Sequence, residues 1–290
     1  METTAFHNEK ERSQPISIQD TGDKTVTGFC TGFDIDRIIT DIRPGELFVI
    51  AVRPGVGKTS LMMNIAQNMA LGNKHTSIGI FSLEHETREI VARMLCCLTR
   101  ISINDLQGQK IQGSLKKAVE QFCKRNILID DANPIDIPDI CDKARRMYYQ
   151  YGVRAILIDY LQLIRNSDIV GASSPKEELA MISSQLKALA EELEIPVILF
   201  THLYKSIGRN ERPTLADLKE KTGDIAQNAD IIAFLHRELP TATPKRPLPA
   251  ELIVAKNRQG SLGTVNLNFF PEYFLFENAK NSNTTTPDAE

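Results

Sequence analysis

The chain has 290 residues, of which 42% are hydrophobic and 24% are charged, a composition typical of one large folded domain. Its 34 basic and 37 acidic residues give a net charge of -3, which excludes the strongly basic surface of proteins that bind nucleic acid over their whole surface. Any DNA contact would therefore depend on a local basic lining.

Five cysteines form an odd set without CxxC spacing, so neither a disulfide framework nor a metal site follows, and a reducing compartment is indicated. The polar N-terminus lacks the apolar segment of a secretion signal, and no apolar run approaches the length of a bilayer. We therefore expect a cytoplasmic protein without a membrane partner.

Along the chain, residues 1–26 are polar and without periodicity, which predicts a flexible arm. One domain is expected over residues 27–277, followed by a disordered tail over residues 278–290. A polar stretch from Arg165 to Pro175 indicates a mobile loop, and the proline-rich residues 239–249 indicate a second loop.

Apolar runs that alternate with helical patterns predict an α/β fold with a mainly parallel, twisted sheet flanked by helices. The run from Ala155 to Ile164 is apolar throughout, which is typical of a central strand buried on both faces. Two late strands around a QGSLG turn predict a C-terminal β-hairpin. The predicted strands lie at Leu47–Val52, Ser77–Leu83, Asn126–Asp130, Ala155–Ile164, Ile195–Phe200, Asp230–Glu238, Glu251–Arg258 and Gly263–Phe270.

The first strand is followed by a glycine-containing turn, a lysine, two hydroxyl residues and a helical pattern. This order is typical of a phosphate loop, in which backbone N–H groups and the start of a helix surround an anion. The alternative is a glycine turn with an incidental lysine, and the strict pattern would have glycine in place of Val52. The candidate nucleotide-binding residues are Arg53, Pro54, Gly55, Val56, Gly57, Lys58, Thr59 and Ser60.

Chemically apt side chains stand at the carboxyl ends of four predicted strands: Lys58, Glu84, Asp159 and the pair Thr201-His202. Because the carboxyl ends of parallel strands share one edge of a sheet, we expect these groups to converge around the phosphates of a bound nucleotide.

Each of these side chains has a functional and a structural interpretation. Asp159 suits the acid that holds Mg²⁺ together with Thr59, or it caps the next element. Glu84 suits the residue that orients or deprotonates water, or it complements the dipole of the following helix. His202 either contacts the terminal phosphate or fills a structural role.

Lys256 and Arg258 are two residues apart on a predicted strand and therefore project from the same face. Cations in such a position stabilise transition-state charge, in their own site or in that of a neighbouring subunit. The alternative is a solvated pair beside a turn, and spacing alone does not separate these interpretations.

The chain resembles the RecA-like motor domain of the replicative DnaB-family hexameric helicases. The segments that carry the resemblance are TGFDIDR, RPGELFVIAVRPGVGKTS, FSLE, ILIDYLQLI, LKALAEELEIPVILFTHL, RPTLADLKE, QNADIIAFLHRE and IVAKNRQGSLGTVNL. The family's phosphate loop commonly begins with alanine, so Val52 is a small departure from its pattern.

The resemblance implies a P-loop ATPase that uses ATP and Mg²⁺, works between the subunits of a ring, expected to be a hexamer, and moves along single-stranded DNA in replication. It places Arg93 near the nucleotide and makes Arg258, assisted by Lys256, the arginine finger of a neighbouring site. It also implies a DNA-contacting loop at LKEKTGD, with Lys219, Glu220, Lys221 and Gly223 as the candidate residues.

Two departures from the family pattern concern coupling to DNA. His202 stands where the family has a glutamine sensor, and KEKTG replaces the family pattern RESG. The resemblance does not extend to the family's N-terminal helical domain, so we expect ring formation to be weak or to need nucleotide, DNA or a partner such as a replicative helicase or loader. The competing interpretations are a RecA-like ATP-binding assembly or helicase-loading protein that does not unwind DNA, and a filament-forming recombinase-like protein.

Overall fold

The computed structural model describes residues 28–72, 76–106, 122–167, 174–203, 211–238 and 247–280, together with residues 116, 119 and 120. The expected arm at residues 1–26 lies outside the described residues, as do residues 168–173 of the expected mobile loop, residues 239–246 of the proline-rich loop and residues 281–290 of the tail.

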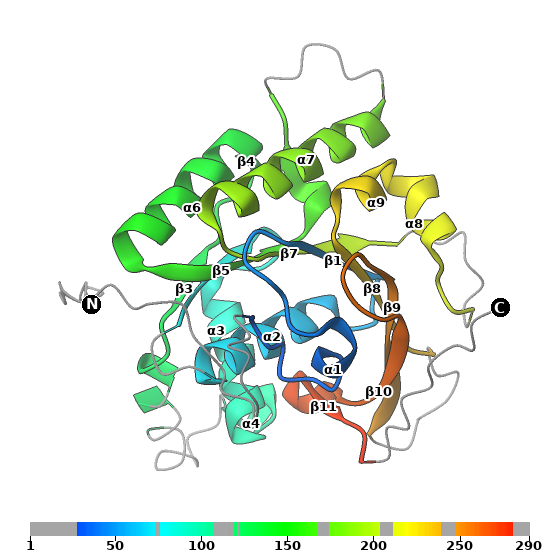
Figure 1. Ribbon diagram of the computed structural model, residues 1–290. Coiled ribbons are helices and arrows are strands. Elements are labelled where there is room, and N and C mark those ends of the chain that lie inside the picture. The colour runs from blue at the N-terminus through cyan, green and yellow to red at the C-terminus, as the bar shows by residue number, and fades with distance from the viewer. Residues whose placement is uncertain are drawn as a thin grey trace, which may run out of the picture.

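A nine-stranded sheet crosses the molecule in the order β11-β10-β9-β8-β1-β7-β5-β2-β3 (Figure 1). The six strands from β8 to β3 pair in parallel, whereas β9, β10 and β11 pair antiparallel at one end of the sheet. This confirms the mainly parallel sheet and the predicted C-terminal hairpin. The strands are β1 (Leu47–Val52), β2 (Ser77–Ser82), β3 (Ile127–Asp130), β5 (Val153–Asp159), β7 (Val197–His202), β8 (Ile231–His236), β9 (Leu248–Asn257), β10 (Gly263–Phe270) and β11 (Leu275–Asn278).

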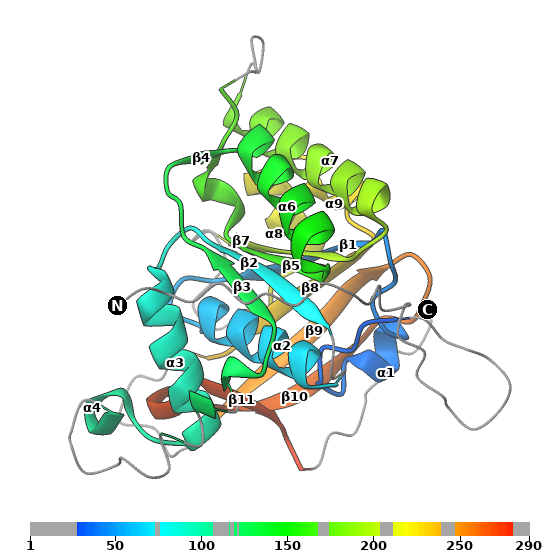
Figure 2. The same cartoon turned by 90° about the vertical axis from the view of Figure 1, so that its left-hand side faces the viewer.

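Helices cover both faces of the sheet, with α1 to α4 on one side and α6 to α9 on the other (Figure 2). None of the helices within the described residues combines the length and apolar composition that crossing a membrane requires. The helices are α1 (Asp36–Ile39), α2 (Lys58–Gly72), α3 (Thr87–Thr99), α4 (Ile103–Leu106), α6 (Ile137–Tyr151), α7 (Pro175–Leu193), α8 (Leu215–Thr222) and α9 (Ile225–Asn228).

Strand β1 lies in the middle of the sheet and is buried along its whole length. Because successive side chains point to opposite faces, Phe48, Ile50 and Val52 join the apolar cluster around α2, while its other residues join the cluster beneath α6 and α7. Two helical layers therefore bury both faces of this strand and fix the position at which the following loop begins.

The predicted ten-residue strand from Ala155 to Ile164 is wrong in length. Strand β5 ends at Asp159, a short 3₁₀ turn, η1 (Leu161–Leu163), follows, and Ile164 belongs to β6 (Ile164–Arg165), which pairs with β4 (Ile135–Asp136) in a separate small sheet. Leu161 and Ile164 are buried in the second apolar cluster, so the apolar run continues because it packs against the core and not because it extends the sheet.

Strand β11 was not predicted from the sequence. It includes Asn278, the first residue of the expected disordered tail, and the Asn278 side-chain oxygen accepts a hydrogen bond from the Asp34 backbone N–H at 2.9 Å. A second contact holds this strand to α2, because the backbone N–H of Phe276 donates to Asn64 Oδ1 at 2.6 Å. The last strand is therefore joined to the helix that follows the phosphate loop.

Candidate active site

The phosphate loop (Arg53–Ser60) joins the end of β1 to the start of α2. Gly55 has φ 78° and Gly57 has φ 117°, conformations that side chains with a Cβ rarely adopt. A Cβ at Gly57 would also lie 3.0 Å from Phe276 Cζ, so the loop passes directly over β11. The predicted glycine requirement at these two positions is confirmed by the backbone.

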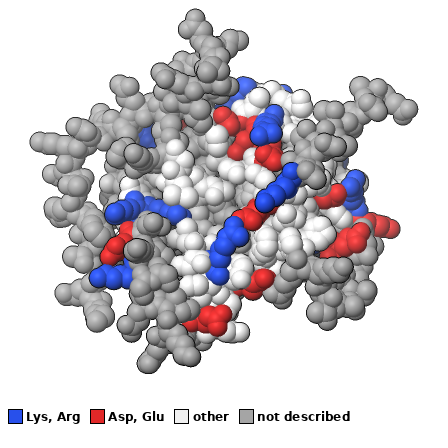
Figure 3. Space-filling model, turned by 90° about the horizontal axis from the view of Figure 1, so that it is seen from below, with Lys and Arg blue, Asp and Glu red and all other residues white. Residues whose placement is uncertain are grey.

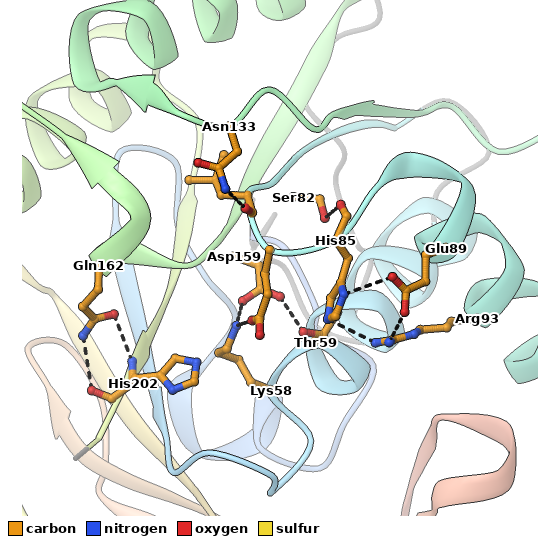
Figure 4. Close-up of polar contacts among 12 residues, drawn as sticks. Lys58, Thr59, Ser82, His85, Glu89, Arg93, Asn133, Asp159, Gln162 and His202 are labelled. Atoms are coloured by element: carbon orange, nitrogen blue, oxygen red, sulfur yellow. Dashed lines mark hydrogen bonds and ion pairs between the residues drawn. The ribbon is translucent and has the colours of Figure 1, made fainter.

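Lys58 lies at the centre of a cluster of side chains from three strand ends (Figure 4). Its Nζ donates to Glu84 Oε2 at 2.8 Å and forms an ion pair with Asp159. Thr59 Oγ1 donates to Asp159 Oδ2 at 2.7 Å. The predicted convergence of Lys58, Glu84 and Asp159 at the carboxyl edge of the sheet is confirmed.

Asp159 is 1% exposed, and both of its carboxylate oxygens are directed at the phosphate loop. The alternative that it caps the next element does not hold, because the N-cap of η1 is Tyr160 and the Asp159 oxygens accept from Lys58 and Thr59. Burial of a carboxylate is costly unless it is paired and hydrogen-bonded, as Asp159 is here.

Glu84 precedes α3 but does not cap it. The backbone N–H of Thr87 in the first turn of α3 donates to Asp131 Oδ2 at 2.7 Å, so another acid fills that role. Burial raises the pKa of Glu84, but the hydrogen bond and charge of Lys58 outweigh this effect and hold the pKa below its ordinary value. The Glu84 side chain is 39% exposed, which leaves it accessible to water.

The His202 imidazole packs against the Tyr160 ring at a tilt of 46°, with centroids 4.1 Å apart, and Lys58 Nζ lies 4.0 Å from the centroid of the same Tyr160 ring. Burial and the nearby charge of Lys58 lower the pKa of His202, which favours the neutral form of the ring. Its Nε2 is buried and has no hydrogen-bond partner among the described residues. An imidazole nitrogen without a protein partner among the described residues therefore lies near the lysine.

The donor set fits a nucleotide bound with Mg²⁺. Among the described residues, no three His, Cys, Asp or Glu side chains form a group that could hold a metal by themselves. Mg²⁺ commonly binds one or two protein oxygens together with phosphate oxygens and water. Thr59 and Asp159, which lie in contact, are the residues that would hold it.

Arg93 lies on α3, on the side of His85 away from Lys58 (Figure 4). Its guanidinium forms an ion pair with Glu89, lies 3.3 Å from His85 Nε2 and stands 5.1 Å from the centroid of Phe274. Its expected place beside the nucleotide stays a prediction.

Lys256 and Arg258 lie at the opposite edge of the sheet from the phosphate loop. Strand β9 runs antiparallel to β8, so Asn257 pairs with Ile231 at the start of β8. The length of β1, roughly 16 Å for five residue steps, separates the two edges. The pair therefore does not serve the site of its own chain.

Both cations bond to the short helix α9. Lys256 Nζ donates to the carbonyl oxygens of Ala226 and Ala229 at 2.6 and 2.5 Å, and Arg258 Nη2 donates to that of Gln227 at 2.6 Å. The prediction that Lys256 and Arg258 project from the same face is confirmed. The alternative that they are a solvated pair beside a turn is wrong. Arg258 is nevertheless 48% exposed, although its Nη1 also pairs with Asp230.

The segment expected to be a DNA-contacting loop is helical up to Thr222, which corrects that prediction. Lys219, Glu220 and Lys221 belong to α8, which begins with a capping box between Thr214 and Asp217. Gly223 ends the helix with φ 65°, and a Cβ there would lie 2.8 Å from the backbone oxygen of Lys176. Close packing against α7 explains why the segment ends in a glycine.

Sequence reasoning missed three polar residues that support the site, of which two are buried and Gln162 is half-buried. Arg237 donates to the phosphate loop, Gln162 bonds to the end of β7, and Asp230 holds the amino edge of β1. Each interrupts or borders an apolar run, and a charged or amide residue in such a position is the signal that could have found it.

Asp230 connects the arginine-finger candidate to the core. Its Oδ2 accepts from the Leu47 backbone N–H at 2.9 Å and from Lys187 Nζ at 2.7 Å, while Arg258 Nη1 lies 3.1 Å from Oδ1. The position of Arg258 is therefore set by the start of the same strand that ends in the phosphate loop.

A central β1 that leads into a phosphate loop, strand-end acids at the same edge and an antiparallel extension of the sheet define a RecA-like P-loop nucleotide-binding domain. One solved structure, described as an ATPase domain, has a TM-score of 0.80 and 30% sequence identity, with 89% of this chain and 93% of that chain covered. A solved DnaB-like replicative helicase, described with its primase interactions, has the same TM-score of 0.80 and the same identity, and the match covers 89% of this chain and 63% of that chain.

The chain belongs to the DnaB-like helicase C-terminal domain family, whose model matches residues 28–278. It is 39% identical over 271 residues to the replicative DNA helicase DnaB of Geobacillus stearothermophilus, and 38% identical over 262 residues to the replicative DNA helicase DnaC of Bacillus subtilis (strain 168). These alignments cover 91% and 87% of this chain but only 59% and 57% of the two relatives. The family resemblance seen in the sequence is thereby confirmed.

Proposed function

We propose that the chain is an ATP-hydrolysing motor domain that assembles into a ring and moves along single-stranded DNA to unwind duplex. The observation that carries the proposal is the contact of Lys58 with Glu84 and Asp159, because it joins a phosphate-binding cation, a candidate base and a candidate metal ligand. Its relatives are replicative DNA helicases, which supports the same activity.

The chain's own residues would divide the work of hydrolysis. Lys58 and the loop N–H groups bind and orient the phosphates, and Thr59 and Asp159 hold Mg²⁺, which neutralises phosphate charge when bound. Phosphate oxygens compete with Glu84 for the Lys58 ammonium, so Glu84 loses the partner that lowers its pKa and becomes a better acceptor for the proton of the attacking water.

The proposal places half of each active site on a neighbouring subunit. Arg258 lies across the sheet from its own phosphate loop and is partly exposed. A side chain that reaches the active site of a neighbouring subunit must be exposed in this way. We propose a hexameric ring in which Arg258, assisted by Lys256, reaches the terminal phosphate bound by the next subunit.

The proposed DNA contact involves Lys219, Lys221 and the turn at Gly223. On the face shown in Figure 3, basic and acidic side chains of the described residues alternate among uncharged ones, so that face offers DNA no continuous basic field.

The test measures ATP hydrolysis by the purified protein with and without single-stranded DNA, together with strand displacement on a forked duplex. The motor proposal predicts hydrolysis that DNA stimulates, and displacement of the strand. Absence of hydrolysis under both conditions would overturn it.

A second candidate function is a RecA-like assembly or helicase-loading protein that hydrolyses ATP without unwinding. The helical form of the LKEKTG segment and the histidine in place of the family's glutamine favour this candidate. Hydrolysis without strand displacement would support it, and unwinding by the isolated protein would eliminate it.

A further inference from the structure

Gln162, from η1, forms three hydrogen bonds to the end of β7 (Figure 4). Its Oε1 accepts from the backbone N–H of His202 at 3.2 Å, and its Nε2 donates to Thr201 Oγ1 at 2.8 Å and to the backbone oxygen of His202 at 3.3 Å. One side-chain amide therefore satisfies both the donor and the acceptor of the His202 backbone.

The Gln162 amide makes the hydrogen bonds that a neighbouring strand would otherwise make to the end of β7. The ladder between β5 and β7 ends at the pair Ile158 and Leu199, so the last residues of β7 have no strand partner on that side. On the other side β1 continues to pair, and Val52 faces His202 in the register. Unpaired backbone groups at this depth would be costly, which gives Gln162 a definite structural task.

The backbone of His202 sets the place of its ring. The imidazole packs at a tilt against Tyr160, which comes from the same segment as Gln162, and its Nε2 is buried without a partner among the described residues. The charged groups that face the ring are Lys58 of α2, Glu84 after β2 and Asp159 of β5. The segment that follows Asp159 thus contacts His202 at both its backbone and its ring.

We propose that Gln162 is a positioning residue: its amide fixes the His202 backbone and thereby holds the imidazole Nε2 beside Lys58, where it meets the phosphates of a bound nucleoside triphosphate. The role of this contact between His202 and the phosphates in hydrolysis rests on the proposed function. The positioning itself rests only on contacts within this chain.

The experiment compares Gln162→Leu, which keeps the side-chain size but removes the amide, with the control Gln185→Leu on the exposed part of α7. Isotope-labelled histidine is observed by NMR in the protein without nucleotide, with His202→Gln used to assign the signal. In the Gln162→Leu variant we expect the His202 signal to shift and its pKa to rise toward the free value of about 6.5, because the ring loses its fixed buried position.

Steady-state hydrolysis gives the second measurement. For Gln162→Leu we expect kcat to fall roughly 10- to 100-fold, as for other orienting partners, while KM for ATP changes by less than about threefold because the phosphate loop is untouched. The Gln185→Leu control should show neither change.

Gln162→Glu keeps the acceptor for the His202 N–H and places a negative charge near the ring. A carboxylate favours the protonated imidazole, so we expect the pKa of His202 to rise further and the acidic limb of the kcat profile to move to higher pH. If the Gln162→Glu variant keeps more activity at alkaline pH than Gln162→Leu, the remaining carboxylate acceptor for the His202 N–H accounts for the rescue. Thermal melting of each variant confirms folding.

An unchanged His202 signal, pKa and kcat in both Gln162 variants would overturn the proposal. If the unaltered protein hydrolyses no ATP while Gln162→Leu still displaces the His202 signal, the proposed function fails and the positioning role stands. If hydrolysis is normal but neither variant affects His202, the positioning role fails and the proposed function stands.

Discussion

The guanidinium of Arg237 donates a hydrogen bond to the carbonyl oxygen of Gly55 at 2.8 Å, and so joins the end of β8 to the phosphate loop. Its Nε also lies 3.4 Å from the carbonyl oxygen of Val56, and the guanidinium stands 5.4 Å from the centroid of Phe269. Arg237 is 7% exposed. A buried cation that is absent from the phosphate-loop motif therefore supports the shape of the loop.

Arg237→Met should loosen this loop while keeping an apolar side chain of comparable length. We expect nucleotide binding to weaken roughly tenfold, and the free energy of unfolding to fall by about 1 to 3 kcal/mol because a charged hydrogen-bond donor is lost. Titration with a fluorescent ATP analogue and urea denaturation measure the two effects. Arg212→Met, at a side chain that is 66% exposed, is the control, and equal affinities in the two variants would contradict the prediction.

Glu84→Gln tests the assignment of the base. We expect kcat to fall by roughly 10²- to 10⁴-fold, because an amide does not accept the proton of water, whereas affinity for ATP should be kept. Rapid-quench hydrolysis and equilibrium nucleotide binding separate the two. The matched control is Glu86→Gln, since Glu86 makes no side-chain capping bond to α3; a loss of the same size in the control would contradict a specific role for Glu84.

Mixing two inactive variants tests the composite site. Lys58→Ala removes the phosphate-binding cation and Arg258→Ala removes the proposed finger, so each homogeneous protein should be inactive. In mixed assemblies an intact loop on one subunit meets an intact Arg258 on the next, and we expect hydrolysis to reappear. Mixing Lys58→Ala with Glu84→Gln provides the control, because both defects lie in the same half of the site. Recovery in that control, or no recovery in the first mixture, would contradict the shared site.

Two histidines, the half-buried His202 and the buried His236, should make stability depend on pH. Burial lowers the pKa of His202 and of His236, with further lowering by Lys58 and by Arg53 respectively. His236 Nδ1 lies 2.7 Å from Arg53 Nη2 and accepts its hydrogen bond only when unprotonated. Both folded pKa values thus lie below the unfolded value of about 6.5.

At a pH between the folded and the unfolded pKa of these histidines, the unfolded chain binds more protons than the folded chain. The contribution of the neutral histidines to folding stability is therefore present above about pH 6.5 and is lost as the pH falls toward the folded pKa values. Each histidine contributes at most about 1.4 kcal/mol per pH unit in that range. Urea denaturation at several pH values should show a smaller loss for the double variant His202→Gln, His236→Gln than for the unaltered protein. The same pH dependence in both would contradict this origin.

Gly55 and Gly57 differ in what surrounds them. A Cβ at Gly55 would meet nothing within 4 Å, whereas one at Gly57 would press on Phe276. Both have positive φ, so each alanine variant carries backbone strain of about 1 to 3 kcal/mol, and Gly57→Ala adds a steric conflict. We expect the larger loss of stability and of ATP binding in Gly57→Ala, measured by thermal melting and nucleotide titration. Equal losses in the two variants would show that the Phe276 ring moves aside without an energetic cost.

The sequence predicted the features that depend on neighbouring residues. The phosphate loop between Leu47 and Ser60 follows from glycine, lysine and hydroxyl positions within one short segment, and its backbone has the expected conformation. The meeting of Lys58, Glu84 and Asp159 was also predictable, because parallel strands bring their carboxyl ends to one edge.

Other features were not predictable from local pattern. The apolar run after Ala155 leaves the sheet at Asp159, whose carboxylate bonds to the phosphate loop, and the segment at Lys219 is helical, with a capping box and close packing against α7. Apolar and charged residues occur in strands, turns and helices alike, so neither outcome was fixed by residue type alone.

Sequence by itself determined the family, the phosphate-binding chemistry and the acids at the strand ends, since each depends on residue types at short, fixed spacings. Only the tertiary structure decided that Arg258 lies across the sheet from its own site, that Arg237 supports Gly55 and that Gln162 holds His202. The physical reason is that these contacts join residues far apart in the chain, and burial makes their hydrogen bonds necessary only after the sheet has formed.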